Sequence, residues 1–255
     1  MKAVILAGGL GTRLAEETRF IPKPLVPIGG HPILWHIMKL YDAHGINEFV
    51  ICAGYRGEMI KEYFTQYFTR SGNITVDTSS HEIIVHDTPT EKWKVTIIDT
   101  GLNSMTGGRL LAVADYLDDE PFCMTYGDGV GDVDIGKLVA YHKSHGKKAT
   151  VTAVTPPGRF GVLEIEDRKV LGFREKIMSD QYQINAGFFV LEKSVLEMVE
   201  GPSTVWEQGP MEALAKQGEL MAYGHTGYWQ PMDTLRDKQT LENLWETNAA
   251  PWKIW

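Results

Sequence analysis

The stretch KAVILAGGLGTRL, residues 2–14, joins a short apolar run to a glycine-rich turn. The run KAVILA has the length and composition of a strand buried in a parallel sheet. The turn supplies three glycines, a hydroxyl and a guanidinium: Gly8, Gly9, Gly11, Thr12 and Arg13. Glycine-rich turns after a strand often bind phosphate, because their backbone N–H groups can approach a ligand closely. We therefore expect an anion site at the end of the first strand.

Three kinds of phosphate-binding loop differ in their spacing. A dinucleotide loop requires G-x-G-x-x-G, but Leu14 stands where the third glycine should be. A triphosphate P-loop requires G-x-x-x-x-G-K-[ST], and neither Gly-Lys-Ser nor Gly-Lys-Thr occurs in the chain. The turn matches a third kind, G-G-x-G-T-R-L after the first strand. In that kind, Thr12 offers a hydroxyl donor and Arg13 a forked positive charge for phosphate oxygens.

Beyond the turn, apolar patterns of helix and strand length alternate. Residues 31–45 and 57–68 have helical periodicity, and residues 48–54 have the pattern of a second buried strand. Such alternation is typical of a parallel sheet with helices on its faces. The predicted fold class is α/β, with a Rossmann-like, mixed but mostly parallel sheet flanked by helices and a small antiparallel β elaboration.

The domain organisation follows from the same patterns. No linker rich in Gly, Ser or Pro divides the chain, so we predict a single domain over residues 1–255. Residues 72–99 are predicted to form antiparallel strands, in a β-rich excursion from the main sheet. An antiparallel meander is predicted from 161 to 191. Residues 225–255 are predicted to form a C-terminal helical tail, in which Thr234 and Asp237 form a capping box.

Composition excludes several classes of partner. The 255 residues are 43% hydrophobic and carry a net charge of −8 without a Lys/Arg run, so nucleic acid is not an expected partner. Cys52 and Cys123 stand in apolar strand-like runs, which favours reduced, buried thiols and a cytoplasmic location. The N-terminal apolar run is too short for a secretion signal. No run approaches the ~20 apolar residues of a membrane span, so no membrane association is expected.

A second motif, PKPLVP, places Lys23 between Pro22 and Pro24. Because the residue before a proline is biased toward extended backbone, we expect Lys23 to be extended and stiff. Alone, this would indicate a solvated lysine in a proline-rich loop. Beside the glycine loop, it predicts a second cation on the same anion.

Two aspartates are candidate metal ligands. Asp128, in TYGDG, follows a buried-looking strand, and parallel sheets bind ligands at the carboxyl ends of their strands. A carboxylate facing a polyphosphate needs a cation, and Mg²⁺ held by one or two carboxylates is the usual solution. Asp233, before the last predicted helix, is the candidate second ligand. From the residues alone, a metal ligand and an N-terminal helix cap are about equally supported for Asp233.

The ordered motifs resemble the sugar-1-phosphate nucleotidyltransferase family. They are LAGGLGTRL (6–14), PKP (22–24), YGDG (126–129), Glu175–Lys176 and INAG (184–187). Within that family, PPGRFG (156–161) and WQPMDTLRDK (229–238) are similar to the cytidylyltransferase branch. The resemblance implies that the phosphate of α-D-glucose 1-phosphate attacks the α-phosphorus of CTP in line, with Mg²⁺ as cofactor and pyrophosphate as leaving group. It also implies a homo-oligomer, a hexamer in this branch.

The resemblance also implies residue roles. Arg13, Lys23 and Asp128 would be catalytic, and Asp128 with Asp233 would hold the metal. Glu175, Lys176 and Asn185 would hold the sugar phosphate. The nucleotide-binding set would be Leu6, Ala7, Gly8, Gly9, Gly11, Thr12, Arg13, Ser104 and Arg109.

One departure concerns the sugar end of the site. The family usually has Glu-Lys-Pro, whereas Ile177 follows Lys176 in this chain. The missing proline releases the backbone of the preceding residue. A modified hexose 1-phosphate or another phosphorylated substrate is therefore an alternative. Because motif spacing does not specify the base, the same chemistry with UTP or dTTP is a second alternative.

Two other classes of protein fit the sequence less well. A non-catalytic sugar-nucleotide sensor would be expected to lose an active-site charge, but Arg13, Lys23, Asp128 and Asp233 are all present. An NAD-dependent oxidoreductase rests only on the α/β pattern and two of three glycines.

Overall fold

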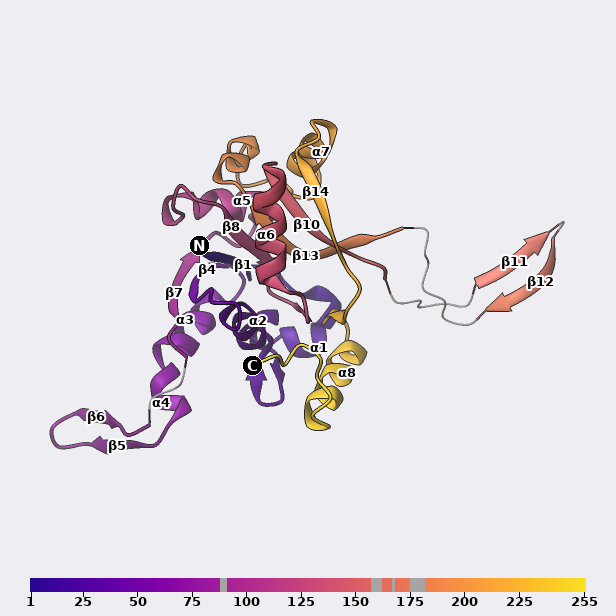
Figure 1. Ribbon diagram of the computed structural model, residues 1–255. Coiled ribbons are helices and arrows are strands. Elements are labelled where there is room, and N and C mark those ends of the chain that lie inside the picture. The colour runs from indigo at the N-terminus through magenta and orange to yellow at the C-terminus, as the bar shows by residue number, and fades with distance from the viewer. Residues whose placement is uncertain (88–90, 157–161, 167, 175–181) are drawn as a thin grey trace.

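The computed structural model describes residues 1–87, 91–156, 162–166, 168–174 and 182–255, and Figure 1 shows a central sheet flanked by helices. Seven described strands form the sheet in the order β14-β10-β13-β8-β1-β4-β7. β13 runs antiparallel to both of its neighbours and all other pairs are parallel, which confirms the predicted sheet. The strand bounds are β1 (Ala3–Leu6), β4 (Glu48–Ala53), β7 (Lys94–Asp99), β8 (Phe122–Tyr126), β10 (Ala149–Val154), β13 (Ile184–Leu191) and β14 (Leu220–His225).

The order of the strands creates a crevice beside β1. From β1 the chain moves outward to β4 and β7 on one side, and later returns to β8 on the other side of β1. The loops that follow β1 and β8 therefore leave the sheet in opposite directions. Open α/β sheets bind their ligands at such a switch point, at the carboxyl ends of the strands.

The sheet is covered on both faces. β1 is fully buried and its side chains alternate, so that Ala3 and Ile5 join one hydrophobic cluster and Val4 and Leu6 join the other. The first cluster contains side chains of α2 (Ile33–Asp42), α6 (Ile135–His145) and α8 (Leu235–Glu246). The second contains side chains of α5 (Thr106–Ala112) and α7 (Gly209–Lys216). This two-sided burial explains the continuous apolar composition of β1.

The remaining elements are short or lie outside the main sheet. They include helices α1 (Ala15–Thr18), α3 (Gly57–Thr65) and α4 (Tyr67–Ser71), strands β2 (Pro27–Ile28) and β3 (His31–Pro32), and 3-10 turns η1 (Thr12–Leu14), η2 (Lys23–Leu25), η3 (Ala114–Tyr116) and η4 (Lys193–Met198). Within the described residues, no helix combines the length and apolar character needed to cross a membrane.

The predicted excursion over 72–99 is correct only in its first part. β5 (Ile74–Asp77) and β6 (Glu82–Val85) form an antiparallel hairpin, which projects from the body in Figure 1. Lys94–Asp99, however, is β7, the parallel edge strand of the main sheet. An edge strand is less covered than a central one, and the side chains of β7 are partly or fully exposed. Polar residues are therefore tolerated in β7, and its sequence resembles the alternating pattern of a half-exposed antiparallel strand.

The predicted meander is also only partly correct. β11 (Val162–Glu166) and β12 (Lys169–Arg174) form an antiparallel hairpin. β13 does not continue it, because this strand pairs with β8 and β10 instead.

The C-terminal segment begins with a strand rather than a helix. β15 (Trp229–Pro231) pairs with β9 (Gly129–Gly131), and the backbone N–H of Met232 donates to the carbonyl of Asp128 at 2.7 Å. This pairing brings the residues after β15 beside the residues after β8. The capping box of Thr234 and Asp237 then begins α8, as predicted.

The aromatic C-terminus packs on its own chain. Trp252 is 1% exposed and its indole N–H donates to Nδ1 of His36 on α2 at 3.3 Å. The other ring nitrogen, Nε2, lies 2.8 Å from the carbonyl of Ile28, which can only accept. The two contacts together require the neutral His36 tautomer that carries its hydrogen on Nε2. Burial lowers the pKa of His36 from 6.5 to about 4.

We expect acid to destabilise this packing. Because the pKa of His36 is lower in the fold than in the unfolded chain, the stabilisation is complete above pH 6.5 and is lost as the pH falls toward 4. The full shift corresponds to about 3 kcal/mol of unfolding free energy. Urea unfolding of the wild type and of His36→Asn at several pH values between 7.5 and 4.5 measures the effect. The wild type should show the steeper pH dependence, and equal slopes would contradict the assignment to His36.

Candidate active site

A cavity of about 600 Å³ opens at the carboxyl ends of β1 and β8. Its walls come from the loop after β1, the start of α5, the ends of β8 and β13, and the segment after β15. Thirteen of the sequence-predicted site residues lie in the described part of the chain, and all of them line this cavity. They are Leu6, Ala7, Gly8, Gly9, Gly11, Thr12, Arg13, Lys23, Ser104, Arg109, Asp128, Asn185 and Asp233.

The glycine loop presents unused backbone donors. Gly11 has φ +65°, a conformation that side chains disfavour, and a Cβ on Gly8 would lie 2.1 Å from Nη1 of Arg109. Within the described residues, the N–H groups of residues 8 to 11 donate to no hydrogen-bond acceptor. Successive free N–H groups in a turn form an anion-binding concavity. The loop therefore has the properties that a phosphate site requires.

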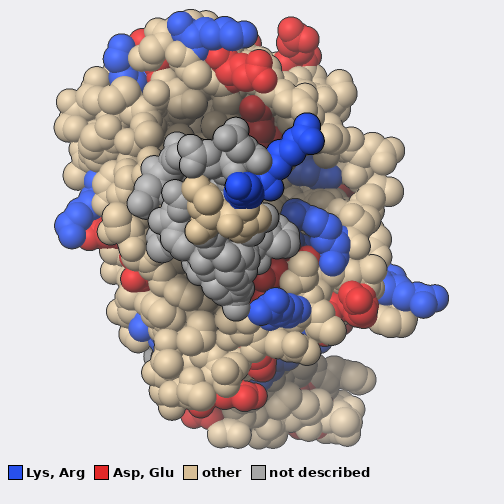
Figure 2. Space-filling view, turned by 90° about the vertical axis from the view of Figure 1, so that its right-hand side faces the viewer, with Lys and Arg blue, Asp and Glu red and all other residues tan. Residues whose placement is uncertain are grey.

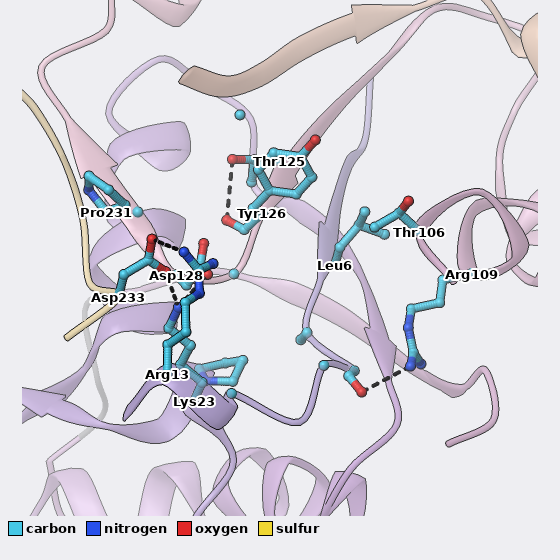
Figure 3. A pocket seen from close by; sticks show the side chains of 18 of the residues that line it. Leu6, Arg13, Lys23, Thr106, Arg109, Thr125, Tyr126, Asp128, Pro231 and Asp233 are labelled. Carbon is cyan, nitrogen blue, oxygen red and sulfur yellow. Dashed lines mark hydrogen bonds and ion pairs between the residues drawn. The ribbon is translucent and has the colours of Figure 1, made fainter. Parts of the chain in front are cut away.

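Arg109 fixes the shape of that loop. Its Nη2 donates to the carbonyl of Gly8 at 2.9 Å, and its Nη1 donates to the carbonyl of Gly101 and to Oγ1 of Thr100 at 2.8 and 2.7 Å. The side chain is buried and joins the loops that follow β1 and β7. Figure 3 shows it on the far side of the cavity from Lys23 and Asp233. Direct contact between Arg109 and a nucleotide stays a prediction.

Replacing Arg109 with lysine should therefore cost stability. A lysine keeps the charge but cannot reproduce the two-pronged fork, so buried carbonyls lose their donors. We expect a loss of about 2–3 kcal/mol of unfolding free energy in urea titrations. The control is Arg236→Lys, at an exposed position of α8. Equal stability of the two variants would contradict the role given to Arg109.

Two cations and two carboxylates meet at the opposite wall. Lys23 Nζ lies 2.7 Å from Oδ2 of Asp128 and 2.8 Å from Oδ1 of Asp233. Nη1 of Arg13 lies 2.6 Å from the other oxygen of Asp233. Lys23 is 7% exposed, whereas the side chain of Arg13 is 71% exposed. Figure 3 shows the four side chains gathered at one side of the cavity, so the predicted convergence of these groups is confirmed.

The backbone at Lys23 differs from the prediction. Lys23 begins the 3-10 turn η2, and the extended residue is Pro22, with ψ 145°. Lys23, the residue before Pro24, is therefore not extended as predicted. The short turn nevertheless directs the ammonium group toward the two aspartates.

The carboxylates are suited to a divalent cation. Asp128 and Asp233 place one oxygen each within 2.8 Å of a single ammonium nitrogen, so both already converge on one cation position. Oxygen donors suit Mg²⁺, which typically takes one or two carboxylates and completes its shell with water and substrate phosphates. No cluster of three or more His, Cys, Asp or Glu ligands occurs among the described residues.

Sequence reasoning missed a second polar group in the cavity wall. The hydroxyl of Tyr126 donates to Oε1 of Glu207 at 2.5 Å and accepts from Nδ2 of Asn185 at 3.1 Å. Oε2 of Glu207 accepts from the hydroxyl of Thr106 at 2.6 Å. Tyr126 directly precedes the GDG motif, and this position could have marked it as a site residue. Nothing around Glu207 in the sequence indicates its role.

Two predicted sugar-phosphate residues, Glu175 and Lys176, lie outside the described residues, as does Ile177.

Ser104 lines the cavity and its hydroxyl donates to the carbonyl of Thr100. Among the described residues on the face shown in Figure 2, basic and acidic side chains are interspersed.

The comparisons with known proteins agree with this geometry. A family model for nucleotidyl transferases matches residues 2–234. The chain belongs to the nucleotidyl transferase family. The glucose-1-phosphate cytidylyltransferase of Salmonella typhi is 58% identical over 256 residues, covering 100% of both chains. A probable glucose-1-phosphate cytidylyltransferase of Bacillus subtilis (strain 168) is 44% identical, again over 100% of both chains.

A solved structure supports the fold of the family. UDP-glucose pyrophosphorylase complexed with UDP-glucose superposes with a TM-score of 0.70 at 15% identity, covering 97% of this chain and 98% of that one. At this identity the likeness concerns the fold alone. The family membership expected from the ordered motifs and the α/β fold expected from the alternating patterns are thereby confirmed.

Proposed function

We propose that the protein transfers a cytidylyl group from CTP to α-D-glucose 1-phosphate, giving CDP-glucose and pyrophosphate. The observation that carries the proposal is the convergence of Arg13, Lys23, Asp128 and Asp233 beside a glycine loop with free N–H groups. Full-length similarity to proteins named glucose-1-phosphate cytidylyltransferase supports the choice of substrates.

The two cations differ in burial, and we assign them different roles in the reaction. Lys23 is held between two carboxylates in the cavity wall, where its charge is little screened by solvent, so it can draw two phosphates together. Arg13 is largely exposed at the cavity mouth and can follow a departing group. We assign to Arg13 the charge that develops on pyrophosphate as it leaves. No side chain needs to form a covalent intermediate.

The site also fits the implied Mg²⁺. Asp128 and Asp233 would hold it, and when bound it would neutralise charge on the phosphate oxygens. In the structure these carboxylates contact Lys23, and Asp233 also contacts Arg13. Both cations would then be released toward the substrate phosphates.

The remaining cavity residues support the two ends of the substrate pair. The free N–H groups of the glycine loop, with Thr12, would bind the triphosphate, and Ser104 would lie toward the nucleoside. Asn185, on the opposite wall, would contact the sugar phosphate together with Glu175 and Lys176. A homo-oligomer, hexameric by resemblance, and a cytoplasmic location are part of the same proposal. The exposed apolar side chains of the β5–β6 hairpin, Ile74, Val76, Ile83 and Ile84, offer a subunit contact.

Pyrophosphate release tests the proposal. The purified protein with Mg²⁺ is assayed against CTP, UTP, dTTP, ATP and GTP, each with glucose 1-phosphate and with mannose 1-phosphate. CTP with glucose 1-phosphate should give the highest kcat/KM, with CDP-glucose identified by mass. Preference for UTP or dTTP would overturn the choice of base, and no release with any pair would overturn the reaction.

A further inference from the structure

Glu207 is a partly buried link between two walls of the cavity. Oε1 accepts the hydrogen bond from Tyr126 at the end of β8, and Oε2 accepts the one from Thr106 at the start of α5. The backbone N–H of Trp206 also donates to the Thr106 hydroxyl, at 2.9 Å. One carboxylate thus connects the wall that carries Tyr126 with the wall that carries Ser104 and Thr106. In the view of Figure 3, Tyr126 lies between the ion-paired cluster and Thr106.

The contacts fix the direction of each hydrogen bond. An ionised carboxylate only accepts, so the Tyr126 hydroxyl must donate to Glu207 and use its lone pairs for Asn185. The Asn185 amide has a second contact, because its oxygen accepts from the backbone N–H of Gly187 at 2.7 Å. One hydrogen of Nδ2 is therefore used by Tyr126 and the second remains for a ligand in the cavity.

The position of the Tyr126 ring is constrained as well. Gly187 has φ +81°, and a Cβ there would lie 2.5 Å from Cδ2 of Tyr126, so the backbone closely covers the ring. Burial and the adjacent Glu207 carboxylate raise the pKa of Tyr126 well above its usual value, which keeps its hydroxyl protonated as a donor. The carboxylate itself has no Lys, Arg or His partner within ion-pair distance among the described residues. Two hydroxyl donors therefore supply the stabilisation that this partly buried carboxylate receives from side chains.

We propose that Glu207 is a positioning residue for the sugar-phosphate end of the site, acting through Tyr126 to aim the free amide hydrogen of Asn185 at a sugar-phosphate oxygen. This inference rests on the proposed function, in which Asn185 faces that substrate. Without Glu207, the Tyr126 hydroxyl can turn, and the Asn185 amide keeps only its contact with Gly187 as a fixed anchor. The aimed amide is then lost while the glycine loop and the charged cluster stay as they are.

Kinetics separate this role from a general structural one. In Glu207→Ala the KM for glucose 1-phosphate should rise about tenfold, which corresponds to one positioned hydrogen bond. The KM for CTP should change less than about twofold, because no residue of the glycine loop contacts Glu207. Glu207→Gln, which keeps an acceptor oxygen, should recover part of the loss. Equal rises in the KM values for glucose 1-phosphate and CTP would give Glu207 a general structural role and overturn the proposal.

A double-mutant cycle tests whether Glu207 acts through Tyr126. Tyr126→Phe should raise the sugar-phosphate KM to a similar extent, and the double variant Tyr126→Phe, Glu207→Ala should raise it no further. Additive effects would overturn the proposed route. The control is Glu212→Ala, an exposed acid on α7 whose contact is with Lys216 at 4.0 Å, and its KM values should equal those of the wild type.

A substrate-free measurement keeps this inference separate from the proposed function. The ¹⁵N side-chain resonances of Asn185, assigned by their loss in Asn185→Asp, should shift in Glu207→Ala and in Tyr126→Phe but not in Glu212→Ala. Unchanged Asn185 resonances in Glu207→Ala would overturn the positioning role even in an active enzyme. Shifted resonances in a protein that releases no pyrophosphate would support the network and contradict only the reaction.

Discussion

Asp128→Asn is expected to lower kcat on the order of 10³-fold while the protein stays folded. Asp128 places Oδ2 2.7 Å from Lys23 Nζ, at the point where both aspartates converge on one cation. The amide is nearly isosteric but carries no charge, so the position loses half of its carboxylate ligands. The side chain is 31% exposed, and its replacement should therefore shift the melting temperature by only a few degrees, roughly. Steady-state pyrophosphate release at saturating CTP, with Mg²⁺ varied, measures the effect.

The matched control for this variant is Asp134→Asn. Asp134 is the N-cap of α6 and accepts from the N–H of Lys137, a role that asparagine performs about equally well. That variant should keep wild-type turnover. A kcat of Asp128→Asn within about threefold of the wild type would place the divalent cation elsewhere.

Lys23→Met is expected to produce the second large effect, in two opposite directions. Turnover should fall on the order of 10²–10³-fold, because a charge in the cavity wall that stabilises the transferring phosphates is lost. Binding of Mn²⁺ to the nucleotide-free protein should become at least about tenfold tighter, because Lys23 no longer competes for Asp128 and Asp233. Titration calorimetry with Mn²⁺ measures the binding without any reaction.

Lys238→Met is the control for the lysine variant. Lys238 also pairs with a carboxylate, Glu17, at 2.6 Å, but it does not line the cavity. It should leave both turnover and Mn²⁺ affinity unchanged. If Lys23→Met lowered turnover without tightening Mn²⁺ binding, the ammonium and the metal would not share a position. If Lys23→Met changed neither turnover nor Mn²⁺ affinity, Lys23 would have no part in the chemistry.

The sequence predicted those parts of the site that depend on local patterns. The glycine loop after β1 was recognisable because its spacing is contiguous, and Asp128 because a strand end is a known position for ligands. Asp233 was less certain on residues alone. Its place depends on β15 pairing with β9 across the fold, and no local pattern encodes that pairing.

Other features depend on contacts that a single sequence does not display. Tyr126 and Glu207 are 81 positions apart, and their hydrogen bond has no spacing signature. β7 was misjudged because an edge strand is partly exposed and imitates the composition of an antiparallel strand. The predicted roles of the residues at the sugar end stay predictions, since Glu175 and Lys176 lie outside the described residues.

The ammonium of Lys23 between Asp128 and Asp233 has a consequence for the resting protein. Two acids this close would repel each other if nothing stood between them, and the lysine supplies a built-in counter-ion. The protein without bound metal or substrate should then fold and stay folded whatever the magnesium concentration in the cell. Removal of Mg²⁺ by a chelator would abolish activity without unfolding the protein.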